Sequence, residues 1–304
     1  MSIGGILPTV AFPWPAVNGR PLLGANGTEA MQTLLRDGGG ALVDYWKVGP
    51  FMGHDALAAL CLQHPLLLHL DDTLSGHRLP SAEELARILG WVELCATPWT
   101  SEHIGFSVPD TTLDGALVTQ AAGDLLTREE ARTNIIRNAR ALAAYLPVPL
   151  LLENLPLFPN LAHLYICEPD FGAEVIEETG CGLLLDLAHA QVSANVLGYE
   201  VHDYLSRLPL RRTVEIHLSG PRPLRELDER RHKLVRENAA SIAHLLTFSE
   251  DNLVDAHAPL QEADYRLLEW ALARSEPRAI SLEYFREPGE LRTQLVRLGQ
   301  MIGR

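Results

Sequence analysis

Short apolar runs alternate with longer amphipathic stretches along most of this chain. The apolar runs have the length of β-strands, whereas several stretches between them repeat apolar residues at the three- and four-residue spacing of a helix. Helices are predicted over 81–96, 127–146 and 262–275. The first two open with a Ser or Thr that is followed three residues later by Glu, the pattern of a capping box.

The apolar runs predict eight strands. Alternating strands and helices indicate parallel βαβ units, and eight such units close into a TIM-type (β/α)8 barrel of the α/β class. The predicted strands are 3–10, 41–48, 65–70, 100–107, 149–154, 182–187, 213–219 and 279–285. Their number and the chain length favour a single barrel domain over 1–304.

Two connections stand out. Residues 17–30 are rich in Gly and Asn, and we interpret them as turns before the first helix. The connection between the seventh and eighth strands, about 220–278, is elongated and is predicted to hold two helices with the segment NLVDAHAPLQ between them. Long insertions in barrel enzymes usually form walls or lids of the active site.

Composition narrows the function classes. The chain has 304 residues, is 47% hydrophobic and carries a formal net charge of −14, and the acidic balance argues against nucleic-acid binding. No apolar run is long enough to span a membrane, and the N-terminus lacks a signal-peptide pattern, so we expect a cytoplasmic protein. The four cysteines form no CxxC pair, and we expect free, buried thiols.

Metal-ligand residue types gather at the predicted strand ends. In a barrel of this type the C-terminal ends of the strands meet at one mouth, where active sites lie. Glu215 and His217 share a strand face, as do Asp255 and His257 if their segment is extended. Asp186 is expected to end its strand, with His189 in the loop just above it. The candidate ligands are five imidazoles and four carboxylates: His69, His103, Glu153, Asp186, His189, His217, Asp255, His257 and Glu283.

This ligand set predicts more than one ion. Nine ligands exceed the six of octahedral coordination, so two or three ions that share carboxylates are expected. Four carboxylates packed together would repel by about 4 kcal/mol per pair at 4 Å and an effective dielectric constant of 20, and cations or protons must relieve that repulsion. Mixed nitrogen and oxygen ligation suits iron, manganese or zinc.

Other polar residues near the strand ends are candidates for supporting roles. Glu102, Asn154 and Glu215 could orient ligating histidines, which usually donate their second N–H to a carboxylate or carbonyl group. Glu102 could instead face away from the mouth and form an ion pair in the barrel wall. Lys47 could contact a substrate or oxyanion, or it could be the structural partner of a carboxylate.

These motifs, in this order, resemble the multinuclear non-haem iron-dependent oxidases, formerly called DUF692. The resemblance rests on the strand that ends at His69 and on SEHI, LLEN, TGCGLLLDLAHAQVSANVLG, EIHLSG, VDAHAP and LEYF, within about residues 65–285. It implies a TIM barrel with two or three iron ions of mixed Fe(II)/Fe(III) state at the mouth, held by the nine residues named above. It also implies dioxygen as co-substrate and a ribosomally made precursor peptide as substrate, often with cysteine chemistry and a small peptide-binding partner protein.

The chain departs from the family pattern on the substrate side. It starts with GGILPTVAFPWP where many members have a GLR-like segment followed by His, and its second strand ends in DYWKVGP, with Lys47, where a Glu-rich segment is usual. The insertion at about 220–278 also looks longer than usual. These departures leave the candidate metal ligands in place, but they affect the substrate side and are compatible with a different substrate.

Two other function classes are compatible with the residues. A xylose isomerase-like or endonuclease IV-like barrel would use zinc or manganese, and Lys47 could polarise the carbonyl group of a sugar, although the acidic charge disfavours the endonuclease. A non-enzymatic metal-binding scaffold would hold its ions without an open coordination position.

Overall fold

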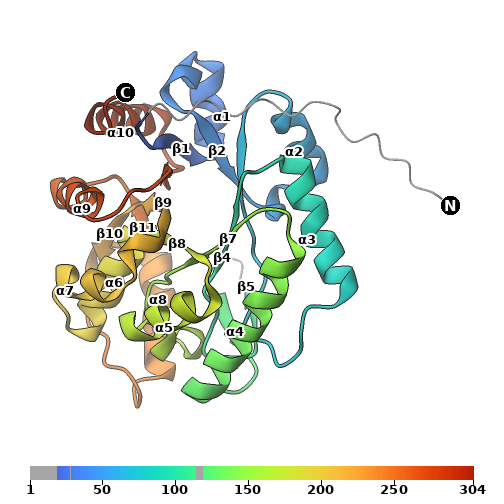
Figure 1. Cartoon of the computed structure of the whole chain (residues 1–304). Coiled ribbons are helices and arrows are strands. Elements are labelled where there is room, and N and C mark those ends of the chain that lie inside the picture. Colours follow the sequence, from blue (N-terminus) through green and yellow to red (C-terminus); the bar gives the residue numbers. More distant parts are fainter. Residues whose placement is uncertain (1–18, 28, 114–118) are drawn as a thin grey trace.

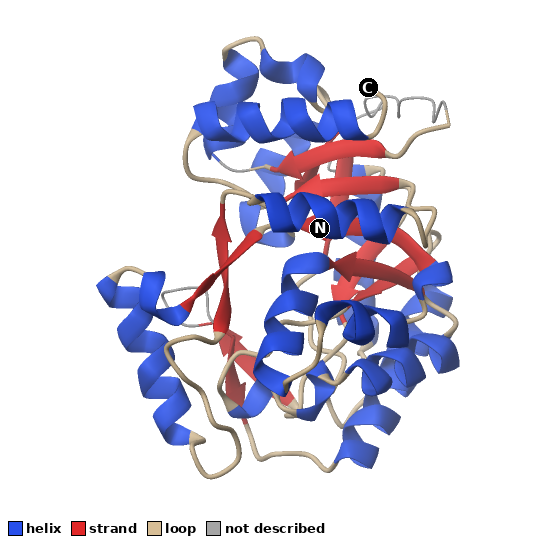
Figure 2. Cartoon of the chain, turned by 90° about the vertical axis from the view of Figure 1, so that its left-hand side faces the viewer, coloured by secondary structure: helices blue, strands red, loops and turns tan. Residues whose placement is uncertain are grey.

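Eight parallel strands close into a barrel in the computed structural model, which describes residues 19–27, 29–113 and 119–304 (Figures 1 and 2). Around the barrel the strands follow the order β1-β12-β9-β8-β7-β4-β3-β2. Their bounds are β1 Leu22–Asn26, β2 Tyr45–Val48, β3 Leu66–His69, β4 Thr100–His103, β7 Leu150–Glu153, β8 Gly182–Asp186, β9 Thr213–Leu218 and β12 Ala279–Leu282. The TIM-type barrel predicted from the sequence is confirmed.

Helices surround the strands (Figure 1). Their bounds are α1 Glu29–Arg36, α2 His54–Cys61, α3 Ala82–Cys95, α4 Arg128–Tyr145, α5 Pro169–Thr179, α6 Leu187–Leu197, α7 Val201–Arg207, α8 Glu229–Ser241, α9 Glu262–Leu272 and α10 Pro288–Met301. The predicted capping boxes are present at the starts of α3 and α4. Among the described residues, no helix has both the length and the apolar character needed to cross a bilayer.

Two antiparallel ribbons are added to the barrel. β5 Asp110–Leu113 pairs with β6 Thr119–Ala122, and β10 Gly220–Pro223 pairs with β11 Leu253–Ala258. The second ribbon lies in the elongated connection between β9 and β12, which also holds α8 and α9. The two predicted helices are therefore present, and the segment between them is an extended strand.

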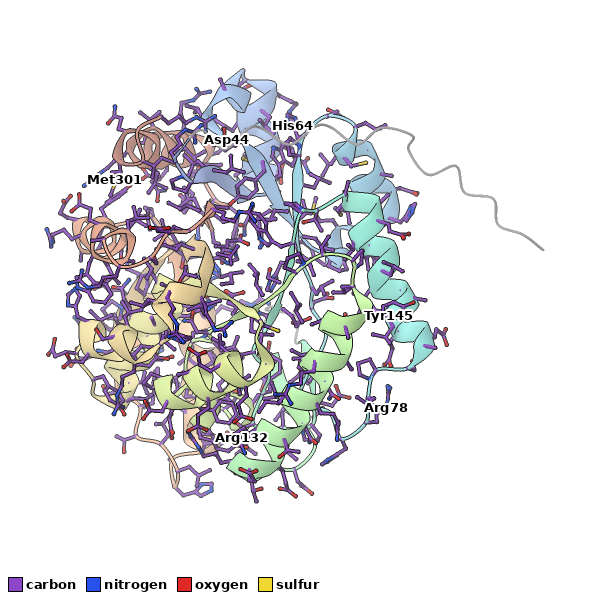
Figure 3. All side chains as sticks on the ribbon, in the orientation of Figure 1. Asp44, His64, Arg78, Arg132, Tyr145 and Met301 are labelled. Carbon is purple, nitrogen blue, oxygen red and sulfur yellow. The ribbon has the colours of Figure 1, made fainter. Side chains whose placement is uncertain are left out.

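Side-chain alternation divides the core into two parts. Tyr45, Leu67, Leu151 and Leu184 belong to a small buried cluster of their own, which alternation places inside the barrel. The larger apolar cluster contains the intervening positions and the inward faces of the helices. Figure 3 shows side chains filling the space between strands and helices, with the labelled Arg78 and Tyr145 at the edge of the molecule.

The first barrel strand differs from the prediction. The predicted strand 3–10 lies outside the described residues, and the segment 17–30, interpreted as turns, contains β1 and the start of α1. Glycine, which pointed to a turn, has a packing role here. An added Cβ at Gly24 would lie 2.3 Å from Cε2 of Tyr45, so the tyrosine ring occupies the space that any side chain at this position would need.

We expect Gly24→Ala to destabilise the barrel by about 1–3 kcal/mol, the usual cost of overpacking a core. Tyr45 cannot easily move aside because its hydroxyl is hydrogen-bonded to Ser281 Oγ at 2.8 Å. The control is Gly90→Ala in α3, where an added Cβ meets no atom within 4 Å and helix propensity predicts stabilisation by about 0.5–1 kcal/mol. Urea unfolding checks both values, and equal effects of the two variants would contradict this account.

Candidate metal centre

The inward-facing side chains change from apolar to polar toward the C-terminal ends of the strands. On β3, Leu67 is followed two residues later by His69, and on β7, Leu151 is followed by Glu153. Because all eight strands run parallel, these polar ends converge at one mouth. Seven of the nine candidate ligands lie near the C-terminal ends of barrel strands, whereas Asp255 and His257 lie within β11 of the added ribbon.

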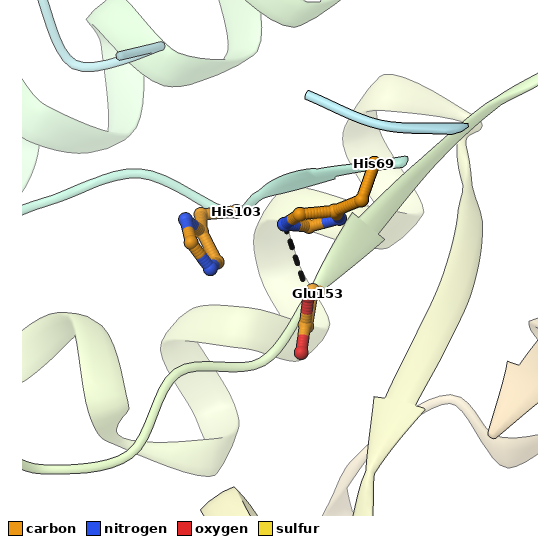
Figure 4. A group of neighbouring side chains, drawn as sticks. All are labelled: His69, His103 and Glu153. Carbon is orange, nitrogen blue, oxygen red and sulfur yellow. Dashed lines mark ion pairs between the residues drawn. The ribbon is translucent and has the colours of Figure 1, made fainter. Parts of the chain in front are cut away.

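The first ligand group consists of His69, His103 and Glu153, whose ligand atoms all lie within 4.8 Å of one another (Figure 4). His69 Nε2 is 3.6 Å from Glu153 Oε2, and the rings of His69 and His103 are 4.9 Å apart between centroids. The three residues come from β3, β4 and β7, which are neighbours in the barrel.

The second ligand group shares a residue with the first. Glu153, Asp186 and His217 also place one ligand atom each within 4.8 Å of one another. The two oxygens of Glu153 face different ways, because Oε2 faces His69 whereas Oε1 is 3.4 Å from His217 Nδ1. A carboxylate in this position could bridge two ions.

The remaining candidates extend this site along the mouth. Asp255 and His257 come from β11, which is extended as their spacing required, and their side chains lie 3.5 Å apart. Glu283, just after β12, is 3.3 Å from His257 Nε2 and 3.2 Å from His217 Nδ1. His189 Nε2 is 3.6 Å from Asp255 Oδ2. The structure therefore brings all nine candidates into one continuous cluster.

Asp186 and His189 have a local arrangement that differs from the prediction. We expected His189 in a loop above β8, but it lies in the first turn of α6. Asp186 is the N-cap of that helix, and its Oδ1 accepts a hydrogen bond from the backbone N–H of His189 at 2.7 Å. Aspartate satisfies the free amides of a helix start well, so the strand passes directly into the helix. The second oxygen of Asp186 stays available for a metal.

The hydrogen bonds of two histidines fix which ring nitrogen faces the site. His189 Nδ1 lies 2.8 Å from the carbonyl oxygen of Asn154, which can only accept, so Nδ1 carries the proton and Nε2 faces Asp186 and Asp255. His217 Nε2 contacts Glu215 Oε1 at 3.0 Å, which leaves Nδ1 toward Glu153 and Glu283. Support of the second ring nitrogen is typical of metal-ligating histidines.

The clustered carboxylates favour positive charge on the groups around them. Burial alone would lower the pKa of His217, but Glu283 and Glu153 raise it to about 10. The pKa of His257 is likewise raised to about 9 against the effect of burial, mainly by Asp255. Burial raises the pKa of Asp186 to about 7. The carboxylates thus recruit protons where no cation neutralises them, and a metal would release those protons on binding.

Lys47 and Glu215 form a buried ion pair beneath the ligands. Lys47 Nζ donates to both oxygens of Glu215, at 2.8 and 2.9 Å, and to Ser101 Oγ at 3.0 Å. Glu215 also accepts hydrogen bonds from Trp99 Nε1 and Ser281 Oγ. Burial would raise the pKa of Glu215, but Lys47 and His217 hold it well below its usual range. Both residues were predicted as site candidates, and the contacts give each a supporting position.

Ser101 also belongs to the candidate site, although the sequence motifs did not indicate it. Its Oγ lies 2.8 Å from His69 Nδ1 and accepts from Lys47, so it connects the ion pair to a candidate ligand. Its position two residues before His103 on the same strand places it on the inward face. Alternation along the SEHI motif could have identified it.

Glu102 and Asn154 contact the backbone around the site. Glu102 is completely buried and accepts hydrogen bonds from the backbone N–H groups of Asp72 and His103, both at 2.7 Å. Neither an ion pair with Lys or Arg nor a place among the ligand groups is found for it within the described residues. Asn154 exchanges two hydrogen bonds of 2.9 Å with the backbone of Asp186 and so joins the ends of β7 and β8.

The residues present fit a metal centre. Within the described chain, Asp186 Oδ2 and His217 Nδ1 are buried and have no hydrogen-bond partner, although buried polar atoms are almost always satisfied. Both atoms belong to one ligand group. The set of imidazoles and carboxylates suits iron, manganese or zinc.

Comparison with known proteins identifies the family. The sequence profile described as "RiPP precursor modification enzyme MbnB/TglH/ChrH" matches residues 44–294, a segment that includes all nine candidate ligands. The chain belongs to this family. It is the family of the multinuclear non-haem iron-dependent oxidases, as the sequence motifs indicated, and its description refers to enzymes that modify precursors of ribosomally made peptides. The match begins after β1, the one strand that our sequence analysis misplaced.

Curated relatives agree with this assignment. The chain is 31% identical to a UPF0276 protein of Bordetella pertussis over 232 residues, 76% of this chain and 72% of the relative. It is 29% identical to a UPF0276 protein of Paraburkholderia phytofirmans over 227 residues, 73% of this chain and 72% of the relative.

Solved structures share the barrel fold at low sequence identity. A family 2 AP endonuclease from Brucella melitensis aligns with a TM-score of 0.54 and 13% identity, over 92% of this chain and 98% of that chain. A D-psicose 3-epimerase aligns with a TM-score of 0.51 and 10% identity, over 92% and 99%. At this identity the likeness concerns the fold alone.

We expect Lys47→Met to destabilise the protein by about 3–5 kcal/mol, because it leaves Glu215 buried and without its charged partner. The double variant Lys47→Met/Glu215→Gln should recover part of that loss. The control is Lys233→Met, which removes a solvent-exposed partner of Glu237 in α8 and should change stability by less than about 1 kcal/mol. Urea unfolding of wild type, Lys47→Met, Glu215→Gln and the double variant measures the coupling, and additive effects of the two buried substitutions would contradict it.

Proposed function

We propose that this protein is an iron-dependent oxidase that uses dioxygen to modify a ribosomally made precursor peptide, with cysteine as the modified residue. The observation that carries the proposal is the position of Glu153, which belongs to two ligand groups and directs one oxygen toward each. A shared carboxylate of this kind is suited to bridge two neighbouring ions. Membership in a family of peptide-precursor-modifying enzymes supports the substrate class.

Two or three iron ions of mixed Fe(II)/Fe(III) state would be held by the nine clustered residues. Iron would supply the redox chemistry with dioxygen, and a substrate thiol would be favoured in its deprotonated form next to it. His69, His103 and Glu153 would hold one ion, and Glu153, Asp186 and His217 a second. Asp255, His257 and Glu283 could complete the second position or hold a third ion.

The protein's own residues orient these ligands and hold their protons. The Lys47–Glu215 pair fixes His217 directly and His69 through Ser101. Asn154 O fixes His189, and the Asp186 cap fixes the start of α6. Such support keeps ligand rings in one orientation and tunes the basicity of the imidazoles. A small peptide-binding partner protein, which the family resemblance implies, would present the substrate.

The alternative of a zinc- or manganese-dependent sugar isomerase relied partly on Lys47 as a group that could polarise a carbonyl. In the structure all three contacts of the Lys47 ammonium group go to Glu215 and Ser101, and the residue is only 4% exposed. This arrangement favours a structural charge over a substrate contact. The oxidase therefore agrees better with the observed contacts than the isomerase does.

Replacing Glu153 tests the shared carboxylate. We expect Glu153→Gln to lose at least one equivalent of bound iron relative to wild type, because the neutral amide cannot bridge two cations. The matched control is Glu102→Gln, a change of the same kind at a buried residue whose hydrogen bonds within the described chain come from the backbone N–H groups of Asp72 and His103, and it should keep the wild-type iron content. Elemental analysis after anaerobic reconstitution measures both. Equal iron content in Glu153→Gln and wild type would contradict a bridging role.

The activity itself is tested with the iron-loaded protein and candidate precursor peptides. After anaerobic reconstitution, exposure to oxygen should give oxygen consumption and a mass change confined to peptides that contain cysteine. Zinc- and manganese-loaded protein are the metal controls, and Cys→Ser peptides are the substrate controls. Turnover of an aldose by the manganese or zinc form, without oxygen consumption by the iron form, would favour the isomerase. Absence of oxygen consumption and of any mass change with cognate peptides would overturn the proposal.

A further inference from the structure

A cationic cavity lies behind the β10–β11 ribbon, on the side away from the metal ligands. It has a volume of about 300 Å³, and its lining includes three arginines, Arg222 from β10, Arg231 from α8 and Arg286 from the segment after β12. Ala256 and Ala258 of β11 also line it. Because side chains alternate along a strand, Asp255 and His257 project to the other face of the same ribbon, toward the metal centre.

The three guanidinium groups are held in place by backbone carbonyl groups. Arg231 and Arg286 both donate to the carbonyl oxygen of Ala256, at 3.0 and 2.7 Å. Arg222 donates to the carbonyl oxygens of Pro221 and Pro259, at 2.7 and 2.6 Å. The groups are therefore positioned before any ligand arrives.

None of these three arginines has a carboxylate partner within ion-pair distance among the residues that the structure describes. Nearby in the same connection, by contrast, Arg225 and Arg236 are paired with Asp251 and Glu250. Two acidic residues, Glu226 and Asp228, also line the cavity. Asp228 is the N-cap of α8, and its pKa is lowered by the hydrogen bond from the backbone N–H of Arg231 and by the charge of that arginine. Glu226 is the other acid of the lining that could compete for the arginines.

We propose that this cavity binds a carboxylate group of an acidic peptide. Guanidinium groups recognise carboxylates through paired, charge-assisted hydrogen bonds, and rigidly held arginines lose little freedom on binding. The proposal rests on the proposed function in one respect, since it takes the ligand to be part of the peptide substrate. The cavity would then hold an acidic residue of the peptide near the mouth in which another residue is modified.

The site also contacts the metal centre through one peptide unit. Ala256 lies between the candidate ligands Asp255 and His257, and its carbonyl oxygen accepts from two of the three arginines. A carboxylate that engages Arg231 and Arg286 would act on the same groups that hold this carbonyl. Peptide binding could therefore shift the Ala256 carbonyl group and, with it, the neighbouring Asp255 and His257.

The test measures binding of acetyl-Glu-Glu-amide to the iron-loaded protein by calorimetry, with acetyl-Gln-Gln-amide as the neutral control. We expect the acidic probe to bind and the neutral probe not to bind. Arg222→Met should weaken it at least about tenfold, the range expected for a charged hydrogen-bond pair. The matched control Arg225→Met, which removes an arginine paired with Asp251 outside the cavity, should leave the affinity unchanged.

Glu226→Gln provides a variant in the opposite direction, because it removes the competing acid and should tighten binding of the acidic probe. Equal affinity of Arg222→Met and wild type would show that the probe binds elsewhere and would overturn the proposal, as would equal affinity for the two probes. The readout needs neither oxygen nor turnover. If the expected binding is found but the oxidase activity is not, the proposed function is refuted and the binding site stands. If the oxidase activity is found but the expected binding is not, the binding site is refuted and the proposed function stands.

Discussion

The buried ion pair between Lys47 and Glu215 is the interaction on which the site depends. Glu215 is completely buried, and an uncompensated carboxylate there would cost several kcal/mol. Lys47 supplies the opposite charge from the far side of the barrel, and the pair is joined to His217 and, through Ser101, to His69. One charge pair beneath the mouth thus orients a histidine in each of the two ligand groups.

The charges of the Lys47–Glu215 pair are neutralised within the protein, whereas those of the carboxylates at the mouth are not. Above it, the carboxylates of Glu153, Asp186 and Glu283 meet histidines whose pKa values they raise, and two buried ligand atoms have no hydrogen-bond partner within the described chain. Glu215, by contrast, has a partner for each oxygen. A cation would neutralise the carboxylates around the histidines, whereas Glu215 has no oxygen left to offer it. This difference explains why Glu215 is better placed to support a ligand than to be one.

Much of this architecture could be predicted from the sequence because two simple periodicities determine it. Alternation along parallel strands brings His69, Glu153 and His217 to one mouth, and the 3.6-residue period with capping boxes locates α3 and α4. β1 escaped prediction because it contains Gly24, which pointed to a turn. The packed ring of Tyr45 requires this glycine, and a contact between distant segments is not visible in a sequence pattern. The position of His189 on a helix depended on the capping geometry of Asp186, and the role of Lys47 depended on a partner 168 residues away.

The β10–β11 ribbon shows how the elongated connection contributes to the site. Its strand β11 supplies Asp255 and His257 to the metal centre on one face and lines the arginine cavity on the other. His257 adopts a positive φ of 43°, a conformation that side-chain-bearing residues rarely take and that needs support from its surroundings. The two arginines that hold the preceding carbonyl group supply such support. If the proposed peptide site and the metal centre are both correct, the same short strand would serve to recognise the peptide and to position two metal ligands.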